Sequence, residues 1–310
     1  MIKKTLLSVL ILISILTGCT NTEKEKETKK VSKEEKEEIY LLIKGISLAE
    51  NGNLEEALGK FKEITVKNPK NIEAVRYTGL CYSKLGDIEN GKKYFEMALK
   101  LNKYDQETLY NYSVLCYSIK DYEKSKELLE RIKIENIDRK VMLAKGYVYF
   151  QLNNYLKSYE EFSKIIFDGT EYNIDVYRTY ISVLKKNGKN DEIYKFAYNL
   201  YTKEKTNFQN LVLLTDYLVE ITAYNNAEEF LKNYGKDNGY SKNVLLKIGE
   251  LMLAKQDFEQ TKTYVTLLDE KYSMDTDVLK FKVKYYRAIG MEEEAKNIEK
   301  MLNNISRSEK

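Results

Sequence analysis

The chain has 310 residues and a net charge of +3, from 51 Lys and Arg against 48 Asp and Glu. Charges this close to balance predict no nucleic-acid partner, because such binding needs a clustered excess of Lys and Arg. Histidine is absent, which excludes Ser-His-Asp and Cys-His nucleophiles and imidazole metal sites. The sequence has no glycine-rich phosphate loop and no metal-ligand spacing either. We therefore predict a protein that is not an enzyme and holds no metal or cofactor.

Residues 1–18 predict an export signal. Two lysines precede twelve residues without charge, 5–16, and this run is too short for a membrane-spanning helix, which needs about twenty residues. The run ends in LTGC, residues 16–19, which resembles the lipobox of bacterial lipoproteins. The resemblance implies cleavage before Cys19 and lipidation of its sulfur and its new amine. A soluble secreted protein and an uncleaved short anchor are the alternatives.

A lipidated Cys19 would hold the protein at a membrane from outside the cytoplasm. Each buried methylene contributes about 0.8 kcal/mol, so two or more acyl chains anchor a protein stably. We expect attachment to the outer face of the cell membrane or to the outer membrane of a bacterium. Residues 20–38 hold six lysines, seven glutamates and almost nothing apolar. This composition predicts a charged tether or a solvated lead-in helix over residues 19–37.

From residue 38 to residue 310 the sequence repeats with a period close to thirty-four residues. In the first unit Gly52 marks a turn, Ala57 and Phe61 follow it, and Pro69 closes the unit. Eight units begin at residues 38, 72, 106, 139, 174, 208, 242 and 276. The pattern resembles the tetratricopeptide repeat, a helix-turn-helix unit with small residues where its two helices touch. The resemblance implies an all-α fold, a right-handed α-solenoid superhelix of about eight repeats.

The small residues of that family fall at positions eight and twenty of each unit. Position eight holds Gly45, Gly79, Ser113, Gly146, Ile181, Thr215, Gly249 and Val283, and position twenty holds Ala57, Gly91, Ser125, Ser158, Ile193, Ala227, Thr261 and Ala295. Bulky side chains at Ile181, Ile193 and Val283 make the fifth and eighth repeats the weakest matches. Because one helix pair cannot cover its own apolar face, we expect neighbouring repeats to stack into a continuous core.

Cys81 and Cys116 each lie in an apolar helical stretch. Buried free thiols are the simpler interpretation, since free cysteine behaves as a small hydrophobe. A disulfide outside the cytoplasm is the alternative.

In the tetratricopeptide family the first helix of each repeat lines a concave face. The resemblance carries this role onto aromatic, amide and basic residues of repeats two to five, namely Arg76, Tyr77, Tyr110, Asn111, Tyr117, Tyr147, Phe150, Arg178 and Lys185. Tyrosine supplies contact area at low entropic cost and arginine pairs with carboxylates. An extended protein or peptide segment is therefore the expected partner. Ordinary packing and surface roles are the alternative, because the chain has 27 tyrosines.

Two finer expectations concern charge in this groove. Three acidic residues occupy groove positions in the sixth and seventh repeats, namely Asp216, Glu220 and Glu250. They predict a groove that is basic in its first half and more acidic further on. Some family members clamp a C-terminal carboxylate, and Arg76, Asn111 and Lys140 occupy three such positions. Leu80 and Ala144 break that clamp pattern.

The sequence as a whole predicts a surface-tethered, non-catalytic scaffold that binds a protein or peptide, with envelope assembly as one setting. The alternative is an accessory lipoprotein that binds a small molecule or glycan on stacked aromatic rings. The absence of tryptophan speaks against the glycan alternative.

Overall fold

The computed structural model describes residues 32–133, 138–166 and 172–308, and every regular element in these ranges is an α-helix. The chain divides into two compact units, Met1–Lys103 and Tyr104–Lys310, and each is described by itself. The first unit holds α2 (Lys33–Glu50), α3 (Leu54–Lys67), α4 (Ile72–Lys84) and α5 (Ile88–Leu101). The second holds α6 (Gln106–Ser118), α7 (Tyr122–Glu130), α8 (Arg139–Gln151), α9 (Tyr155–Ser163), α10 (Ile174–Lys186), α11 (Asn190–Lys203), α12 (Phe208–Glu220), α13 (Tyr224–Asn238), α14 (Lys242–Ala254), α15 (Phe258–Tyr272), α16 (Thr276–Ala288) and α17 (Glu292–Ser308).

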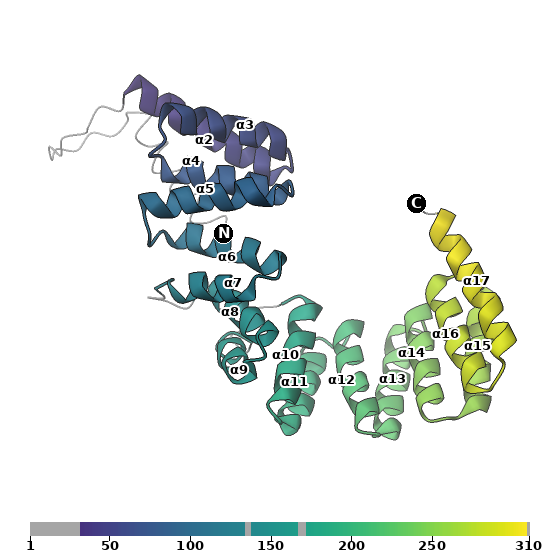
Figure 1. Cartoon of the computed structure of the whole chain (residues 1–310). Coiled ribbons are helices and arrows are strands. Elements are labelled where there is room, and N and C mark those ends of the chain that lie inside the picture. The colour runs from purple at the N-terminus through teal and green to yellow at the C-terminus, as the bar shows by residue number, and fades with distance from the viewer. Residues whose placement is uncertain (1–31, 134–137, 167–171, 309–310) are drawn as a thin grey trace, which may run out of the picture. The chain divides into compact units, whose positions relative to one another are not determined.

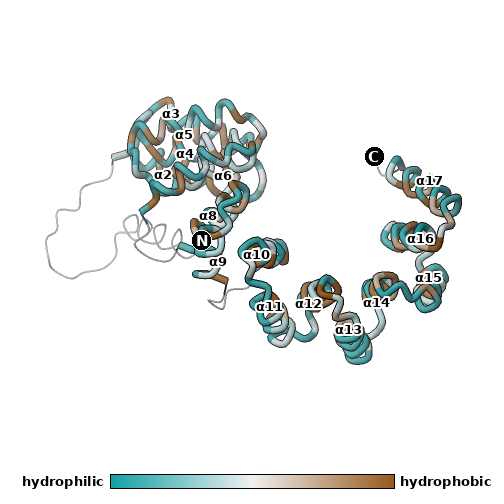
Figure 2. The backbone as a smooth tube through the Cα atoms, turned by 60° about the horizontal axis from the view of Figure 1, so that its bottom comes forward, coloured by the Kyte–Doolittle hydropathy of each residue, from teal (hydrophilic) through white to brown (hydrophobic). Residues whose placement is uncertain are grey.

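Both units are built from antiparallel helix pairs (Figure 1). We call the even-numbered first helix of each pair an A helix and the odd-numbered second helix a B helix. Within each unit every helix packs against the next one along the chain, and most A helices also contact the A helix of the following pair. Hydrophobic and hydrophilic residues alternate along the helices of both units (Figure 2). The all-α repeat fold predicted from the sequence is therefore confirmed.

The helix starts follow the repeat frame read from the sequence. Seven A helices begin at the predicted residues 72, 106, 139, 174, 208, 242 and 276. The first A helix differs, because α2 begins at Lys33 rather than at residue 38. The Ser32 hydroxyl accepts a hydrogen bond from the Glu35 N–H (3.1 Å), and the Ser32 N–H donates to the Glu35 carboxylate (2.7 Å). This capping box starts the helix early, inside the predicted tether. Cys19 and the lipobox lie outside the described residues.

The turn between the two helices of a repeat has the same backbone in all eight repeats. Position fifteen is left-handed in each, with φ between 58° and 84°: Gly52, Gly86, Lys120, Asn153, Gly188, Thr222, Gln256 and Gly290. The N–H of the following residue bonds back to the carbonyl five residues earlier, as in Ala223 to Leu218 (2.8 Å). This is the Schellman arrangement, which ends the A helix and directs the chain into the B helix.

Thr222→Gly is expected to stabilise the second unit by about 1 kcal/mol. The left-handed conformation costs an L-residue about 1–2 kcal/mol, and the larger entropy of unfolded glycine offsets part of the relief. Thr222 is exposed, so the change removes no packing. Urea unfolding followed by circular dichroism measures the effect. The reciprocal variant Gly188→Thr, at the same position of the preceding repeat, is expected to lose a similar amount, and unchanged midpoints for both variants would contradict the strain assigned to this turn.

Small residues bring the two helices of a repeat together, as the sequence predicts. A Cβ added to Gly45 would lie 2.6 Å from the ring of Phe61, and one added to Gly146 would lie 2.8 Å from the ring of Phe162. The Ser158 hydroxyl, at position twenty, donates to the carbonyl of Gly146 at position eight (2.8 Å). The aromatic ring at position twenty-four thus occupies the space that a side chain at position eight would need.

The fifth repeat folds despite its bulky residues. Ile181 and Ile193 are both buried in one cluster with Tyr180, Phe196 and Phe162. Larger side chains there fill the space between α10 and α11, so the helix pair forms without the small-residue contact.

Cys81 and Cys116 are buried free thiols, which agrees with the simpler interpretation. Burial raises the pKa of Cys81 to about 11, which keeps that thiol protonated. In the part of the chain that the structure describes, no helix is both long and apolar enough to cross a membrane.

Candidate binding surface

Aromatic rings from two consecutive A helices meet on the second unit. Tyr117 of α6 and Tyr147 of α8 are half-buried, with ring centroids 6.4 Å apart. The amide of Gln151 donates to the Tyr117 hydroxyl (3.4 Å), and Thr179 of α10 lies near the Tyr147 hydroxyl. The ring of Tyr147 packs edge-on against the buried Phe162 (5.5 Å). These contacts fix two rings in place while leaving part of each open, which is how aromatic binding residues are held ready for a partner.

Burial sets the protonation of these phenols. It raises the pKa of Tyr147 and of Tyr117, although the nearby Thr179 and Gln151 side chains counter part of the rise. Both hydroxyls therefore stay neutral at physiological pH. A neutral phenol can both donate and accept a hydrogen bond.

A lysine ammonium lies over the ring of Tyr110, which is also on α6. The ammonium of Lys140 is 4.8 Å from the ring centroid of Tyr110 and 2.9 Å from the Glu107 carboxylate. Lys140 is one of the predicted carboxylate-clamp residues, and here its charge is already paired. Asn111, another of them, is half-buried beside Tyr110 on the same helix.

The other predicted groove residues of the second unit differ in the contacts that their side chains make. The Phe150 ring lies against Tyr155 (5.7 Å). Arg178 is exposed, and its ion pair in the described part of the chain is with its helix neighbour Asp175 (3.4 Å). It is therefore the predicted cation with the most open charge. Lys185 is bonded to Glu220 of the next A helix.

The acidic residues of the later repeats are neutralised in the same way. Asp216 pairs with Lys247, and Glu250 lies 2.8 Å from Lys284 and 3.8 Å from Lys247. Glu220 is bonded to Lys185, so every predicted acid in this set has a lysine beside it. Ion pairs between neighbouring A helices therefore offset the negative charge that these three residues bring to the later repeats.

Arg76 and Tyr77 belong to the first unit and serve its packing. Arg76 is only 8% exposed, with its guanidinium 5.3 Å from the Tyr77 ring centroid and 3.9 Å from Glu73. The Tyr77 ring stacks on Phe61 at 5.0 Å. Arg76 thus offers a partner little accessible surface.

Sequence reasoning missed Gln151 and the ion pairing of lysines across repeats. A signal for them does exist in the repeat frame. Residues at equal or adjacent positions of consecutive repeats become neighbours, as in Glu107 with Lys140 and Tyr117 with Gln151. Opposite charges or hydrogen-bonding partners spaced by 33 to 35 residues would have identified these contacts.

Comparisons with known proteins bear on the fold. No protein-family model matches the sequence. A TPR repeat-containing protein of Methanocaldococcus jannaschii is 28% identical over 176 residues, which are 53% of this chain and 30% of that protein. A tetratricopeptide repeat protein from Parabacteroides merdae superposes with a TM-score of 0.53 at 18% identity, over 79% of this chain and 98% of that one. Pseudomonas aeruginosa pilF gives a TM-score of 0.46 at 15% identity, over 82% of this chain and all of that one.

The chain thus spans under a third of the length of the curated relative that it matches, and at 18% identity the likeness to a solved structure is one of fold. That likeness agrees with the repeat frame, the left-handed residue at position fifteen, and the ring packed against position eight. The chain therefore has the fold of tetratricopeptide repeat proteins.

Proposed function

We propose that this protein is a non-catalytic scaffold, tethered to a membrane through a lipid on Cys19, that binds an extended protein or peptide segment along the A helices of its second unit. The observation that carries the binding proposal is the pair of half-open rings, Tyr117 and Tyr147, held in contact across consecutive repeats. A partner segment can cover both rings at little entropic cost, because neighbouring groups already fix them.

The contacts around the pair suit a polypeptide. Gln151 presents an amide beside Tyr117, and Arg178 presents an exposed guanidinium on α10, the next A helix after Tyr147. Amides pair with the peptide backbone, and guanidinium groups pair with carboxylates through two parallel bonds. The surface thus offers apolar contact, backbone hydrogen bonding and one anion partner on three consecutive A helices.

A photo-crosslinking amino acid at Gln151 is expected to capture the partner in intact cells. Mass spectrometry then identifies the captured protein and the peptide within it. The same amino acid at Tyr194, on the B helix α11 and 37% exposed, is the matched control and is expected to give no such adduct.

Affinity measured with the identified peptide tests the residues themselves. Tyr117→Ala is expected to weaken binding by about 5- to 30-fold, the usual cost of removing an aromatic anchor. Tyr194→Ala, which removes an exposed ring outside this surface, is expected to leave the dissociation constant unchanged. Equal losses in the two variants, or adducts from position 194 alone, would show that the A helices are not the binding surface.

A further inference from the structure

The outer face of α2, the first A helix, differs from the same face of every later A helix. Positions three and ten of a repeat lie on that face. Both positions are buried in all seven later repeats: Ala74, Thr108, Val141, Val176, Asn210, Val244 and Val278 at position three, and Cys81, Leu115, Val148, Val183, Tyr217, Leu251 and Tyr285 at position ten. In α2 they hold Tyr40, which is 61% exposed, and Ser47, which is also exposed.

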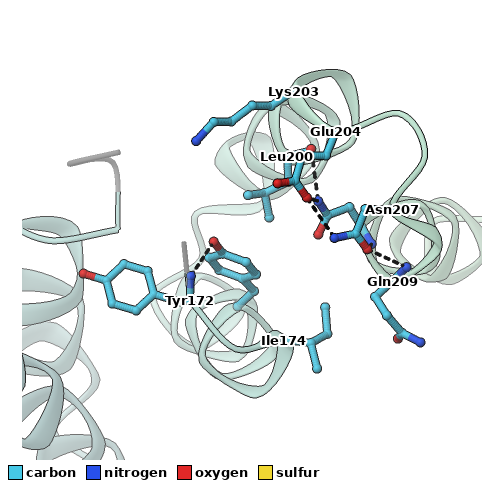
Figure 3. A pocket seen from close by; sticks show the side chains of 9 residues that line it. Tyr172, Ile174, Leu200, Lys203, Glu204, Asn207 and Gln209 are labelled. Carbon is cyan, nitrogen blue, oxygen red and sulfur yellow. Dashed lines mark hydrogen bonds between the residues drawn. The ribbon is translucent and has the colours of Figure 1, made fainter. Parts of the chain in front are cut away.

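The contacts of the later A helices show what covers this face elsewhere. Ala74 of α4 lies in one apolar cluster with Ile64 of the preceding B helix, α3. At the start of α12, Asn210 donates to the carbonyl of Leu200 on α11 (3.2 Å), beside a pocket of about 190 Å³ that Leu200 helps to line (Figure 3). The first A helix packs against α3 and α4, and no described helix precedes it. We call its uncovered side the open face of α2.

All three lysines of α2 lie on the open face. At about 100° per residue, Lys33, Lys36 and Lys44 lie within about 40° of Tyr40 around the helix axis. They are exposed, and none of them forms an ion pair in the described part of the chain. Ile43, three residues after Tyr40, is 40% exposed and extends the apolar surface beside the ring. The open face thus combines an aromatic ring and an aliphatic side chain with three available ammonium groups.

The five glutamates of α2 leave this positive charge in place. Four of them point at least about 80° away from Tyr40 around the helix axis: Glu34, Glu35, Glu38 and Glu50. The fifth, Glu37, lies 3.1 Å from the Lys67 ammonium of α3. The open face of α2 is therefore basic.

We propose that the open face of α2 docks on the surface of a membrane that contains anionic phospholipids. Each lysine close to such a surface favours binding by about fivefold. A tyrosine at the level of the headgroups places its ring in the apolar region and its hydroxyl in water. Lysine side chains can lay their methylene groups along the apolar region while their ammonium groups reach the lipid phosphates. The proposal rests on the lipid proposed for Cys19, which would bring α2 to the bilayer.

The length of chain between Cys19 and α2 favours a lipid surface as the occupant. Residues 20–31 separate Cys19 from Ser32, the N-cap of α2, and this distance is at most about 45 Å. A lipid on Cys19 would therefore keep α2 at a high local concentration of lipid, at which a weak attraction is enough for docking. Two copies of this chain docked through α2 would instead place lysines against lysines, which repel each other.

Tryptophan at position 40 reports the docking directly, because the chain contains no other tryptophan. The full Tyr40→Trp protein is combined with vesicles of phosphatidylglycerol and phosphatidylcholine in equal parts, and its fluorescence is expected to be quenched by lipids with brominated chains. Quenching is expected to be lost in vesicles of phosphatidylcholine alone and at high salt. Leu156→Trp is the matched control, because Leu156 is also 61% exposed but lies on α9 of the second unit. Its fluorescence is expected to stay unquenched.

Glutamine in place of the three lysines of α2, in the Tyr40→Trp protein, tests the charge. The ratio of docked to undocked protein is expected to fall about 100-fold at low salt, from about fivefold per lysine. The matched control makes the same replacement at three exposed lysines on the B helices α3 and α5 of the same unit, Lys62, Lys93 and Lys100. This control is expected to leave the quenching unchanged.

The outcomes separate the docking from the lipid tether. Equal quenching in anionic and neutral vesicles, or quenching that survives the loss of the three lysines, would overturn the docking. Absence of quenching in protein whose lipid is verified by mass spectrometry would overturn the docking and leave the tether intact. Quenching of protein that carries no lipid would support the docking and contradict the tether. A change in tryptophan emission that depends on protein concentration and needs no vesicles would overturn the proposal in favour of a second copy of this chain.

Discussion

Replacing Phe162 with alanine is expected to destabilise the second unit by about 3–5 kcal/mol. The ring is fully buried, 5.5 Å from the ring of Tyr147 and 6.2 Å from that of Tyr180. It occupies the space left open by Gly146, and the bond from Ser158 to the Gly146 carbonyl holds the two helices at this separation. The helices therefore cannot close fully over the cavity that alanine would leave. The free-energy cost of this cavity adds to the stabilisation lost with the buried ring.

Leu156→Ala on the same helix is the matched control. Leu156 is 61% exposed, so its loss is expected to change stability by less than about 0.5 kcal/mol. Urea unfolding followed by circular dichroism measures both variants. Because each repeat contacts only its neighbours, hydrogen exchange in α8, α9 and α10 is also expected to rise selectively in Phe162→Ala. Matching midpoints for the two variants would contradict the role assigned to the ring.

The repeat frame was predictable because it depends on local constraints that recur in every unit. Gly52 and Gly86 mark left-handed turns, and the seven later A helices begin at the predicted residues. Lys120, Asn153, Thr222 and Gln256 adopt the same left-handed turn without being glycine. Asparagine tolerates this conformation, but lysine, threonine and glutamine give no sign of it, and only their place in the frame identifies those three residues. The repeat contacts impose the conformation and outweigh the residue's own preference.

The candidate binding surface was less predictable, because the exposure of a side chain depends on the neighbouring repeat. Arg76 and Arg178 occupy groove positions in the same family pattern, yet Arg76 is buried and Arg178 is exposed. Lys185 and Glu220 each suggested a charged patch when considered alone, and together they form an ion pair. The pocket beside Asn210 depends on the path of the loop from α11 to α12, which residue types alone do not specify.

On the proposed binding surface, ion pairs between repeats would leave uncharged contacts as the main source of affinity. Exposed pairs such as Lys284 with Glu250 contribute about 0–1 kcal/mol each and are screened by salt. Their main effect on binding is to cancel the field that a charged partner would otherwise meet. We therefore expect Tyr117 and Tyr147 to determine affinity and Arg178 to select for an acidic group on the partner.

Replacing Cys19 with alanine is expected to abolish lipid attachment altogether. The sequence holds three cysteines, and a thioether-linked diacylglyceryl group needs a thiol at the proposed cleavage site. Metabolic labelling with a palmitate analogue is expected to mark the wild-type protein and leave Cys19→Ala unmarked. Mass spectrometry of the wild-type protein is expected to find an N-terminus at Cys19 that carries the lipid. Membrane fractionation alone does not test this, since an uncleaved run over residues 5–16 could hold the unprocessed chain at the membrane.

The matched control removes the other two thiols and keeps the proposed site. Cys81 and Cys116 are buried inside helices, where an acyl-transferring enzyme cannot reach them in the folded chain. A variant with both changed to alanine is therefore expected to label as strongly as the wild type. Label retained in Cys19→Ala, or lost in the double variant, would contradict a lipid at Cys19. Unlabelled wild-type protein released into the medium would instead identify a secreted scaffold, with the binding surface around Tyr117 unaffected by that result.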